Sequence, residues 1–206
     1  MDNHLKIKLV KTAEGFAYDV EILEENATVG QYIEALDAFL DAKVAPCLGC
    51  DNCCYQRIPL TLPDLYAYGG REKARVAAFL QDRVQIEKKG RALDLYLRRD
   101  AAEACTFLDR QQQRCLDHPH RSLVCHTYIC LPQTARANAL REFLINDGED
   151  AAFGALFHWG LLEDFNACRE SYPIKPAWQG KTHQEVLLKD VLPAKLWETL
   201  TSPLPW

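Results

Sequence analysis

The sequence lacks the long apolar segments that mark membrane proteins and exported proteins. No run approaches the ~20 apolar residues that a transmembrane helix needs, and charged residues interrupt the first six positions. A signal peptide would require an uninterrupted apolar core at this place. We therefore expect a cytoplasmic protein with no membrane partner.

A basic block and the common catalytic motifs are also missing. The net charge is −5, and acidic and basic residues are mixed along the chain. Proteins that bind nucleic acid usually carry a basic face, so no nucleic-acid partner is expected. The sequence has no phosphate-binding loop, dinucleotide fingerprint, G-x-S-x-G or H-E-x-x-H motif, and no C-x3-C-x2-C spacing of the kind used in radical chemistry. Any enzymatic activity would have to depend on a metal, and whether the protein is an enzyme stays open.

Cysteine, by contrast, is abundant and clustered. Eight of the nine cysteines fall in two groups of four, which we name the first arm (residues 47–54, C-x2-C-x2-C-C) and the second arm (residues 105–130). Two dense groups of thiols in one chain are typical of a metal or iron–sulfur site. The predicted metal ligands are Cys47, Cys50, Cys53 and Cys54 in the first arm and Cys105, Cys115, Cys125 and Cys130 in the second.

Disulfide bonds and simple packing are the alternatives to metal binding. Disulfides need an oxidising compartment, which nothing in the sequence indicates. A chain of 206 residues can also build an ordinary core without covalent cross-links. Cysteines that only pack in a core would be scattered rather than clustered. Cys168 alone fits that description, and we interpret it as a packing residue.

Thiolate ligands favour zinc or an iron–sulfur cluster, with copper(I) as a third choice. Four thiolates close a tetrahedral zinc site, whereas C-x2-C-x2-C is similar to part of the ferredoxin run for a [4Fe–4S] cluster. We rank an iron–sulfur cluster above zinc. The eight thiols could serve two four-ligand sites or one site with spare thiols. Adjacent sulfurs rarely point at one small ion, so we expect Cys53 and Cys54 to diverge.

Three histidines and one arginine accompany the second arm. Imidazole is a common ligand of zinc and iron, but His118 and His120 are interpreted as surface turn residues. His126 is the better candidate because it is next to a cysteine, although eight thiols already satisfy two tetrahedral sites. Arg121 is assigned to the centre as a cofactor-binding residue, because its guanidinium would offset the negative charge of a metal held by thiolates.

The hydrophobic pattern predicts an α+β fold that is mostly helical, with short strands around the cysteine-rich site and helices packed outside. Alternating residues predict a hairpin over residues 5–23, and apolar spacing predicts a helix over 29–42 capped by Thr28. The remaining predicted elements are a helix that starts near Thr61, a helix over 71–89, a strand over 91–99, a hairpin closed by 109–114, two helices over 134–165 separated by Gly148, a helix from Thr182 to Leu188, and a last helix after Pro193.

We expect a single domain over residues 1–206. It would comprise a hairpin and helix (1–43), a cysteine-cluster core (44–131) and a helical C-terminal part (132–206). Trp206 is expected to pack on the chain itself, with docking on a protein partner as the alternative.

The cysteine arrangement resembles the bacterial CxxCxxCC cysteine-cluster family (YkgJ-like proteins), which is described as zinc- or iron-chelating. The first arm matches the first signature of that family. The second signature is matched by Cys105, Phe107, Leu108, Cys115, Arg121, Cys125 and Cys130. Ser122 stands where the family usually has proline, and His126 where arginine is common. The resemblance covers about residues 44–131 and implies metal chelation. Because some relatives are described as flagellin lysine methylating proteins, it also keeps an enzymatic function open.

Three functional hypotheses follow. The first is a metal-binding protein whose iron–sulfur cluster or zinc mainly holds the two arms together. The second is an enzyme that uses the metal centre for electron or methyl transfer. The third is a metal carrier or sensor, which would need labile metal.

Overall fold

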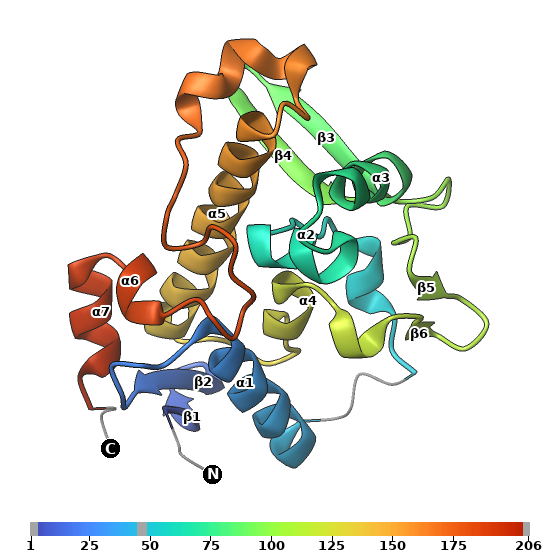
Figure 1. The fold of residues 1–206 in the computed structure, drawn as a ribbon. Coiled ribbons are helices and arrows are strands. Elements are labelled where there is room, and N and C mark those ends of the chain that lie inside the picture. Colours follow the sequence, from blue (N-terminus) through green and yellow to red (C-terminus); the bar gives the residue numbers. More distant parts are fainter. Residues whose placement is uncertain (1–3, 45–48, 204–206) are drawn as a thin grey trace. The chain divides into compact units, whose positions relative to one another are not determined.

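The computed structural model describes residues 4–44 and 49–203 (Figure 1). The predictions for Cys47 and Trp206 lie outside these residues. The chain divides into two compact units, and each is built from separate stretches of sequence. We name them the hairpin unit (Met1–Pro46, His126–Leu144 and His183–Trp206) and the cysteine unit (Cys47–Cys125 and Ile145–Thr182).

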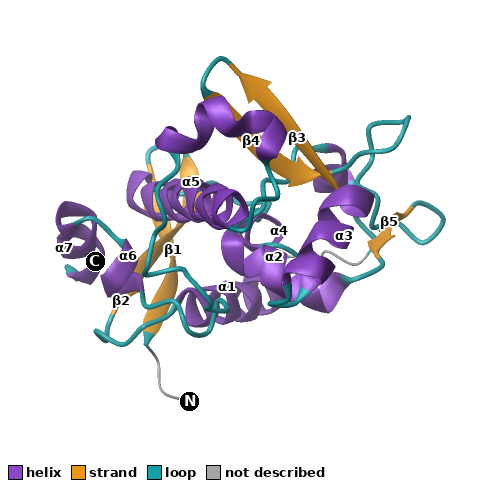
Figure 2. Cartoon of the chain, turned by 45° about the horizontal axis from the view of Figure 1, so that its top comes forward, coloured by secondary structure: helices purple, strands orange, loops and turns teal. Residues whose placement is uncertain are grey.

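Helices and small antiparallel strand pairs make up the two units (Figure 2). The predicted class, α+β and mostly helical, is therefore confirmed. Within the described ranges, none of the helices is both long enough and apolar enough to cross a bilayer.

The hairpin unit begins with the predicted hairpin. Strand β1 (Leu5–Thr12) pairs antiparallel with β2 (Gly15–Ile22), with Leu5 opposite Ile22. Tyr18, Val20 and Ile22 are buried, as their alternation predicts. The backbone of Tyr18 is also bonded to later chain, because its N–H donates to the Pro132 carbonyl at 2.9 Å.

Helix α1 (Val29–Lys43) follows, and its predicted cap is present. The Thr28 side chain accepts from the Gln31 N–H at 3.1 Å, and the Gln31 side chain accepts from the Thr28 N–H at 2.9 Å. This reciprocal capping box satisfies two N–H groups that the first turn would otherwise leave unpaired. The buried side of α1 carries Ile33, Leu36 and Leu40 at helical spacing.

The end of the chain is less helical than predicted. The segment from Thr182 forms turns rather than a helix, and only the short α6 (Leu188–Val191) follows it. The backbone of this segment forms hydrogen bonds with the start of α1 instead, since the Val29 N–H donates to the Val186 carbonyl at 2.9 Å. The last predicted helix is confirmed as α7 (Ala194–Thr201), which starts directly after Pro193.

In the cysteine unit, a short 3₁₀ turn η1 (Asn52–Tyr55) precedes α2 (Leu62–Gly69) and α3 (Lys73–Arg83). The prediction of a helix over 71–89 is wrong beyond Arg83. Residues Val84–Lys89 form strand β3, which pairs antiparallel with β4 (Ala92–Leu97). Gly90 makes the tight turn between them at φ +67°, a conformation that glycine adopts without strain. Cross-strand pairing outweighs helical propensity in this segment.

Helix α5 (Ala135–His158) and the 3₁₀ segment η3 (Glu163–Ser171) replace the two helices predicted over 134–165. Gly148 does not break α5. A Cβ atom at Gly148 would lie 2.7 Å from Cγ2 of Thr61, so glycine is needed for close packing rather than for a turn. Glycine in a helix can serve such an approach at a modest cost in propensity.

The second arm forms the predicted small hairpin. Strand β5 (Leu108–Asp109) pairs with β6 (Arg114–Cys115). The 3₁₀ turn η2 (His118–His120) and the short helix α4 (Leu123–Thr127) then follow.

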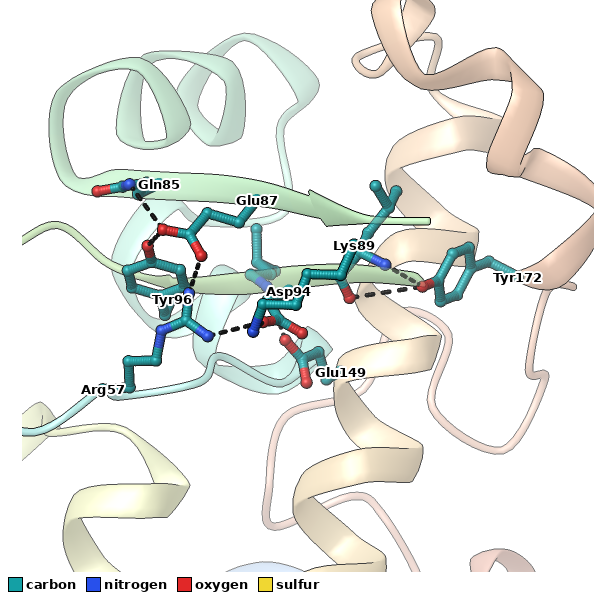
Figure 3. Close-up of polar contacts among 10 residues, drawn as sticks. Arg57, Gln85, Glu87, Lys89, Asp94, Tyr96, Glu149 and Tyr172 are labelled. Atoms are coloured by element: carbon teal, nitrogen blue, oxygen red, sulfur yellow. Dashed lines mark hydrogen bonds and ion pairs between the residues drawn. The ribbon is translucent and has the colours of Figure 1, made fainter. Parts of the chain in front are cut away.

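A polar network covers one face of the β3–β4 hairpin (Figure 3). Arg57 forms ion pairs with Glu87 and with Asp94, the latter at 2.7 Å, and its guanidinium lies 4.3 Å from the ring centroid of Tyr96. Glu149 of α5 accepts a hydrogen bond from the Leu95 N–H at 2.7 Å. The Arg57 contacts attach the loop after the first arm to the β3–β4 hairpin, and the Glu149 bond attaches α5 to β4.

Asp64 of α2 should be a strong determinant of stability. It is 1% exposed and accepts hydrogen bonds from the Thr61 N–H and hydroxyl, both at 2.8 Å, and from the Leu123 N–H at 2.9 Å. Asp64→Ala leaves buried donors unpaired, so we expect a loss of about 2–4 kcal/mol in urea unfolding. Glu170→Ala, at a side chain that is 92% exposed, is the control and should change stability by less than about 0.5 kcal/mol. Equal effects of the two substitutions would contradict this role.

Glu149 should make stability depend on pH. Burial raises the pKa of Glu149 from 4.5 to about 7, and the charges of Asp94 and Asp150 raise it further. The hydrogen bond from the Leu95 N–H and the charge of Arg57 lower it. Because the folded-state pKa is raised, the stabilising contribution is complete below pH 4.5 and is lost as pH rises through about 7. Glu149→Gln should therefore match the parent protein near pH 5 and exceed its unfolding free energy by about 2 kcal/mol at pH 8. A difference that is constant between these pH values would exclude this effect.

Candidate metal centre

Six of the eight predicted ligands line one pocket of about 50 Å³ in the cysteine unit. The pocket thus combines thiols from both arms. Cys130, by contrast, is exposed and belongs to the hairpin unit. The cysteines that line the pocket are Cys50, Cys53, Cys54, Cys105, Cys115 and Cys125.

A backbone hydrogen bond joins the two arms directly. The Cys105 N–H donates to the Cys54 carbonyl at 2.8 Å. On the first-arm side, the Cys54 N–H donates to the Asp51 carbonyl at 2.9 Å within the η1 turn. On the second-arm side, the Leu108 N–H donates to the Cys105 carbonyl at 2.9 Å. Each arm is therefore folded into a tight turn at the point where it meets the other.

Cys125 is positioned by the residues just before it. The Ser122 hydroxyl is 3.4 Å from the Cys125 sulfur and donates to it, and the same hydroxyl accepts from the Cys125 N–H at 3.4 Å. The Leu123 N–H is bound by Asp64. Ser122 therefore supplies a hydrogen bond to the Cys125 sulfur. A proline at this position, which the sequence analysis noted as the usual residue, could not make that bond.

Both Cys53 and Cys54 line the same pocket, whereas the sequence predicts that they diverge, one to each of two sites or one to a site and one to packing. The 3₁₀ turn brings the adjacent sulfurs within hydrogen-bonding reach. The thiol of Cys54 donates to the sulfur of Cys53, and this lowers the pKa of Cys53 to about 6 against the opposing effect of burial. The same bond, together with burial, raises the pKa of Cys54. The pair therefore gives up one proton easily and the second with difficulty.

The three second-arm thiols that line the pocket are held in their neutral form. Burial raises the pKa of Cys105 to about 11 and that of Cys125 to about 12, and it also raises the pKa of Cys115. The charges of neighbouring thiolates raise these pKa values further. Two backbone amides act in the opposite direction, since the Phe107 N–H bonds the Cys105 sulfur and the Asp117 N–H bonds the Cys115 sulfur.

Several pocket residues escaped the sequence interpretation. Part of the pocket wall is apolar and comes from five side chains. His118, interpreted as a surface turn residue, lines the pocket, and its Nε2 lies 3.0 Å from Nη1 of Arg121. Arg121, which the sequence analysis assigned to the centre, lines the pocket as well, and its charge adds to the lowering of the Cys53 pKa by Cys54. The apolar wall consists of Ile58, Tyr68, Leu97, Phe107 and Leu108.

The other two histidines have partners away from the pocket. His126 lies in the hairpin unit, where its Nδ1 is 2.9 Å from a carboxylate oxygen of Asp37. His120 is exposed, and its Nδ1 is 2.8 Å from a carboxylate oxygen of Asp117. Cys168 is 1% exposed, as expected for a packing residue.

The donor set of the pocket suits a soft metal. Among residues 4–44 and 49–203, no three Cys, His, Asp or Glu side chains already stand in an arrangement that would hold an ion. A bound cation would nevertheless stabilise the ionised form of the pocket thiols, which otherwise repel one another as thiolates. A water-sized atom needs roughly 10–15 Å³, so a pocket of about 50 Å³ has room for more than one ion.

Arg121 should add to the reactivity of Cys53, which the bond with Cys54 sets in the first place, in the reduced, metal-stripped protein. Its positive charge favours the Cys53 thiolate. Arg121→Gln should therefore raise the pKa of Cys53 and slow its alkylation by iodoacetamide near pH 7 by about threefold or more. Arg121→Lys should restore most of the rate, and Arg91→Gln, at an exposed residue outside the pocket, should not change it. Peptide-resolved mass spectrometry measures the rate, and an unchanged pH profile in Arg121→Gln would contradict the assignment.

Comparison with known proteins agrees with this description of the site. The model of the CxxCxxCC family, described as a zinc- or iron-chelating domain, matches residues 46–145. Neither the curated proteins nor the solved structures contain a match to the chain. The matched segment includes both cysteine arms and therefore every thiol that lines the pocket. Residues 46–145, just under half of the chain, thus match the CxxCxxCC family, which is described as a zinc- or iron-chelating domain.

Proposed function

We propose that the protein binds a single metal centre, an iron–sulfur cluster or thiolate-bound zinc, in the pocket of the cysteine unit. The observation that carries the proposal is the convergence of six thiols from two distant arms. The six proposed ligands are the pocket cysteines, whereas Cys47 lies outside the described residues and Cys130 belongs to the hairpin unit. Arg121 is proposed to offset its negative charge.

One polynuclear centre agrees better with the geometry than two separate four-ligand sites. The thiols of Cys53, Cys54, Cys105, Cys115 and Cys125 are close enough to shift one another's pKa values. A tetrahedral zinc ion takes four ligands and an iron–sulfur cluster takes four cysteines, so one centre uses four of these sulfurs, or two ions share them through bridging thiolates. We keep the iron–sulfur cluster ahead of zinc because the apolar wall and the sulfur hydrogen bonds are features that tune such clusters.

The proposed role of the metal is to hold the arms together. When bound, the centre supplies thiolate–metal bonds between turns that are otherwise joined by backbone hydrogen bonds. Binding free energy of this kind adds to folding free energy. An enzyme that uses the centre for electron or methyl transfer is the second candidate. A groove that shares two residues with the pocket favours it, because a reactive centre needs access for a second molecule.

Anaerobic purification, followed by iron, zinc and acid-labile sulfide analysis and a visible absorption spectrum, tests the proposal. A broad absorption shoulder with sulfide would identify an iron–sulfur cluster, and a colourless protein with stoichiometric zinc would identify the alternative. Removal of the metal should lower the thermal unfolding midpoint by roughly 10 °C or more. A protein without metal, or a melting curve that is unchanged after verified metal removal, would contradict the proposal.

Single cysteine variants distinguish one centre from two. Cys54→Ser in the first arm and Cys105→Ser in the second should each abolish most of the metal content if the arms share one centre. Two independent sites would instead leave about half of the metal in each variant. Cys168→Ser is the matched control, because Cys168 is buried but lines no part of the pocket.

A further inference from the structure

A second cavity of the cysteine unit lies against the wall of the thiol pocket. It is an open groove of about 670 Å³ between α2 and α3. Small-molecule sites commonly measure about 300–1,000 Å³, so the groove is large enough for a ligand of moderate size. Tyr68 and Phe107 line both cavities. A molecule in the groove would therefore touch the same side chains that face the sulfurs.

Aromatic rings form the boundary between groove and pocket. The ring of Tyr68 stacks on Phe79, with centroids 5.0 Å apart, and on Phe107, with centroids 5.3 Å apart. The three rings come from α2, α3 and the segment after Cys105, so they tie these elements together. Their exposed parts give the groove an apolar surface.

Two arginines, Arg75 and Arg83, line the groove together with two carboxylates, those of Asp82 and Asp117. Arg83 places its guanidinium 5.3 Å from the Phe107 centroid and pairs with Asp82 at 2.6 Å. Arg75 pairs with Glu72 at 3.5 Å, but both side chains are more than 70% exposed. Such an exposed pair contributes little, so the Arg75 guanidinium can turn to an anionic ligand at little cost. An apolar wall beside arginine favours a molecule that has an apolar body and a negatively charged group.

Two groove residues also contact the sulfurs through their backbone. The amide of Phe107 bonds the Cys105 sulfur, and the amide of Asp117, another groove residue, bonds the Cys115 sulfur. Hydrogen bonds to ligand sulfurs tune the properties of a metal centre. A ligand that shifts these two residues would therefore alter the centre, and metal binding would alter the groove by the same free energy.

We propose that this groove binds a small amphipathic anion, with an aromatic or apolar body and a carboxylate, phosphate or sulfonate group, and that its occupancy is linked to the metal centre. Tyr68, Phe79 and Phe107 contact the body, and Arg75 binds the anionic group. The linkage to the metal rests on the proposed function, whereas the binding site itself does not.

The binding site is tested with 8-anilinonaphthalene-1-sulfonate, an aromatic anion whose fluorescence rises on binding, added to the full chain as purified with its metal. We expect saturable binding of one molecule per chain. Arg75→Gln and Phe79→Ala should each weaken it by about fivefold or more. Arg91→Gln, which removes an exposed guanidinium outside both cavities, should leave it unchanged. Because Arg75 is exposed, an effect of Arg75→Gln cannot be ascribed to misfolding.

Binding that does not saturate, or that all three variants weaken equally, would contradict the proposed binding site.

The linkage is tested by following metal loss to excess EDTA with and without saturating probe. We expect the release rate to change by about twofold or more, and Arg75→Gln to abolish the change at the same probe concentration. Saturable binding with an unchanged release rate would overturn the linkage alone. A protein that holds no metal would refute the proposed function and the linkage with it, and the probe titration would then decide the site by itself.

Discussion

The thiol pocket is organised around one backbone hydrogen bond, from the Cys105 N–H to the Cys54 carbonyl. It fixes the second arm against the first, and the side chains on either side of it then face the same pocket. Asp64 fixes the segment around Cys125 in the same way, because its carboxylate accepts a hydrogen bond from the Leu123 N–H. The polypeptide therefore frames the pocket by its own contacts. A metal would add bonds between groups that are already neighbours, which lowers the entropy cost of ligation.

Local patterns were sufficient to predict much of the fold. The first hairpin, the capped helix α1, the small hairpin of the second arm and the helix after Pro193 all follow from contacts close in sequence. The segment 84–89 was misassigned because its apolar residues fit both a helical and an alternating pattern, and pairing with β4 decided between them. Gly148 was misread as a helix break because its role is set by Thr61, which is distant in sequence. The expected single domain and the two observed units are not directly comparable, since the units interleave along the chain.

The site was predictable only in its chemistry. Cysteine spacing indicated a shared thiol centre, and the structure brings six of the thiols together. Spacing could not show that Cys53 and Cys54 line the same pocket, because that depends on the backbone conformation of the η1 turn. Nor could it indicate Tyr68 or Ile58, which carry no metal-binding signature and reach the pocket through tertiary packing. Three-dimensional contacts are also what reveal the shared wall between pocket and groove.

The distance along the chain between the thiols has a consequence for biosynthesis. Cys125 follows Cys50 by 75 residues, and ribosomes add about 5–20 residues per second. The first thiols of the pocket therefore emerge roughly 4–15 s before the last one. Until Cys105 emerges, 51 residues after Cys54, the nascent chain can offer only the first arm to metals or oxidants in the cell. A partner that shields these early thiols, or a supply of metal timed to the completion of Cys125, would increase the yield of correctly assembled protein.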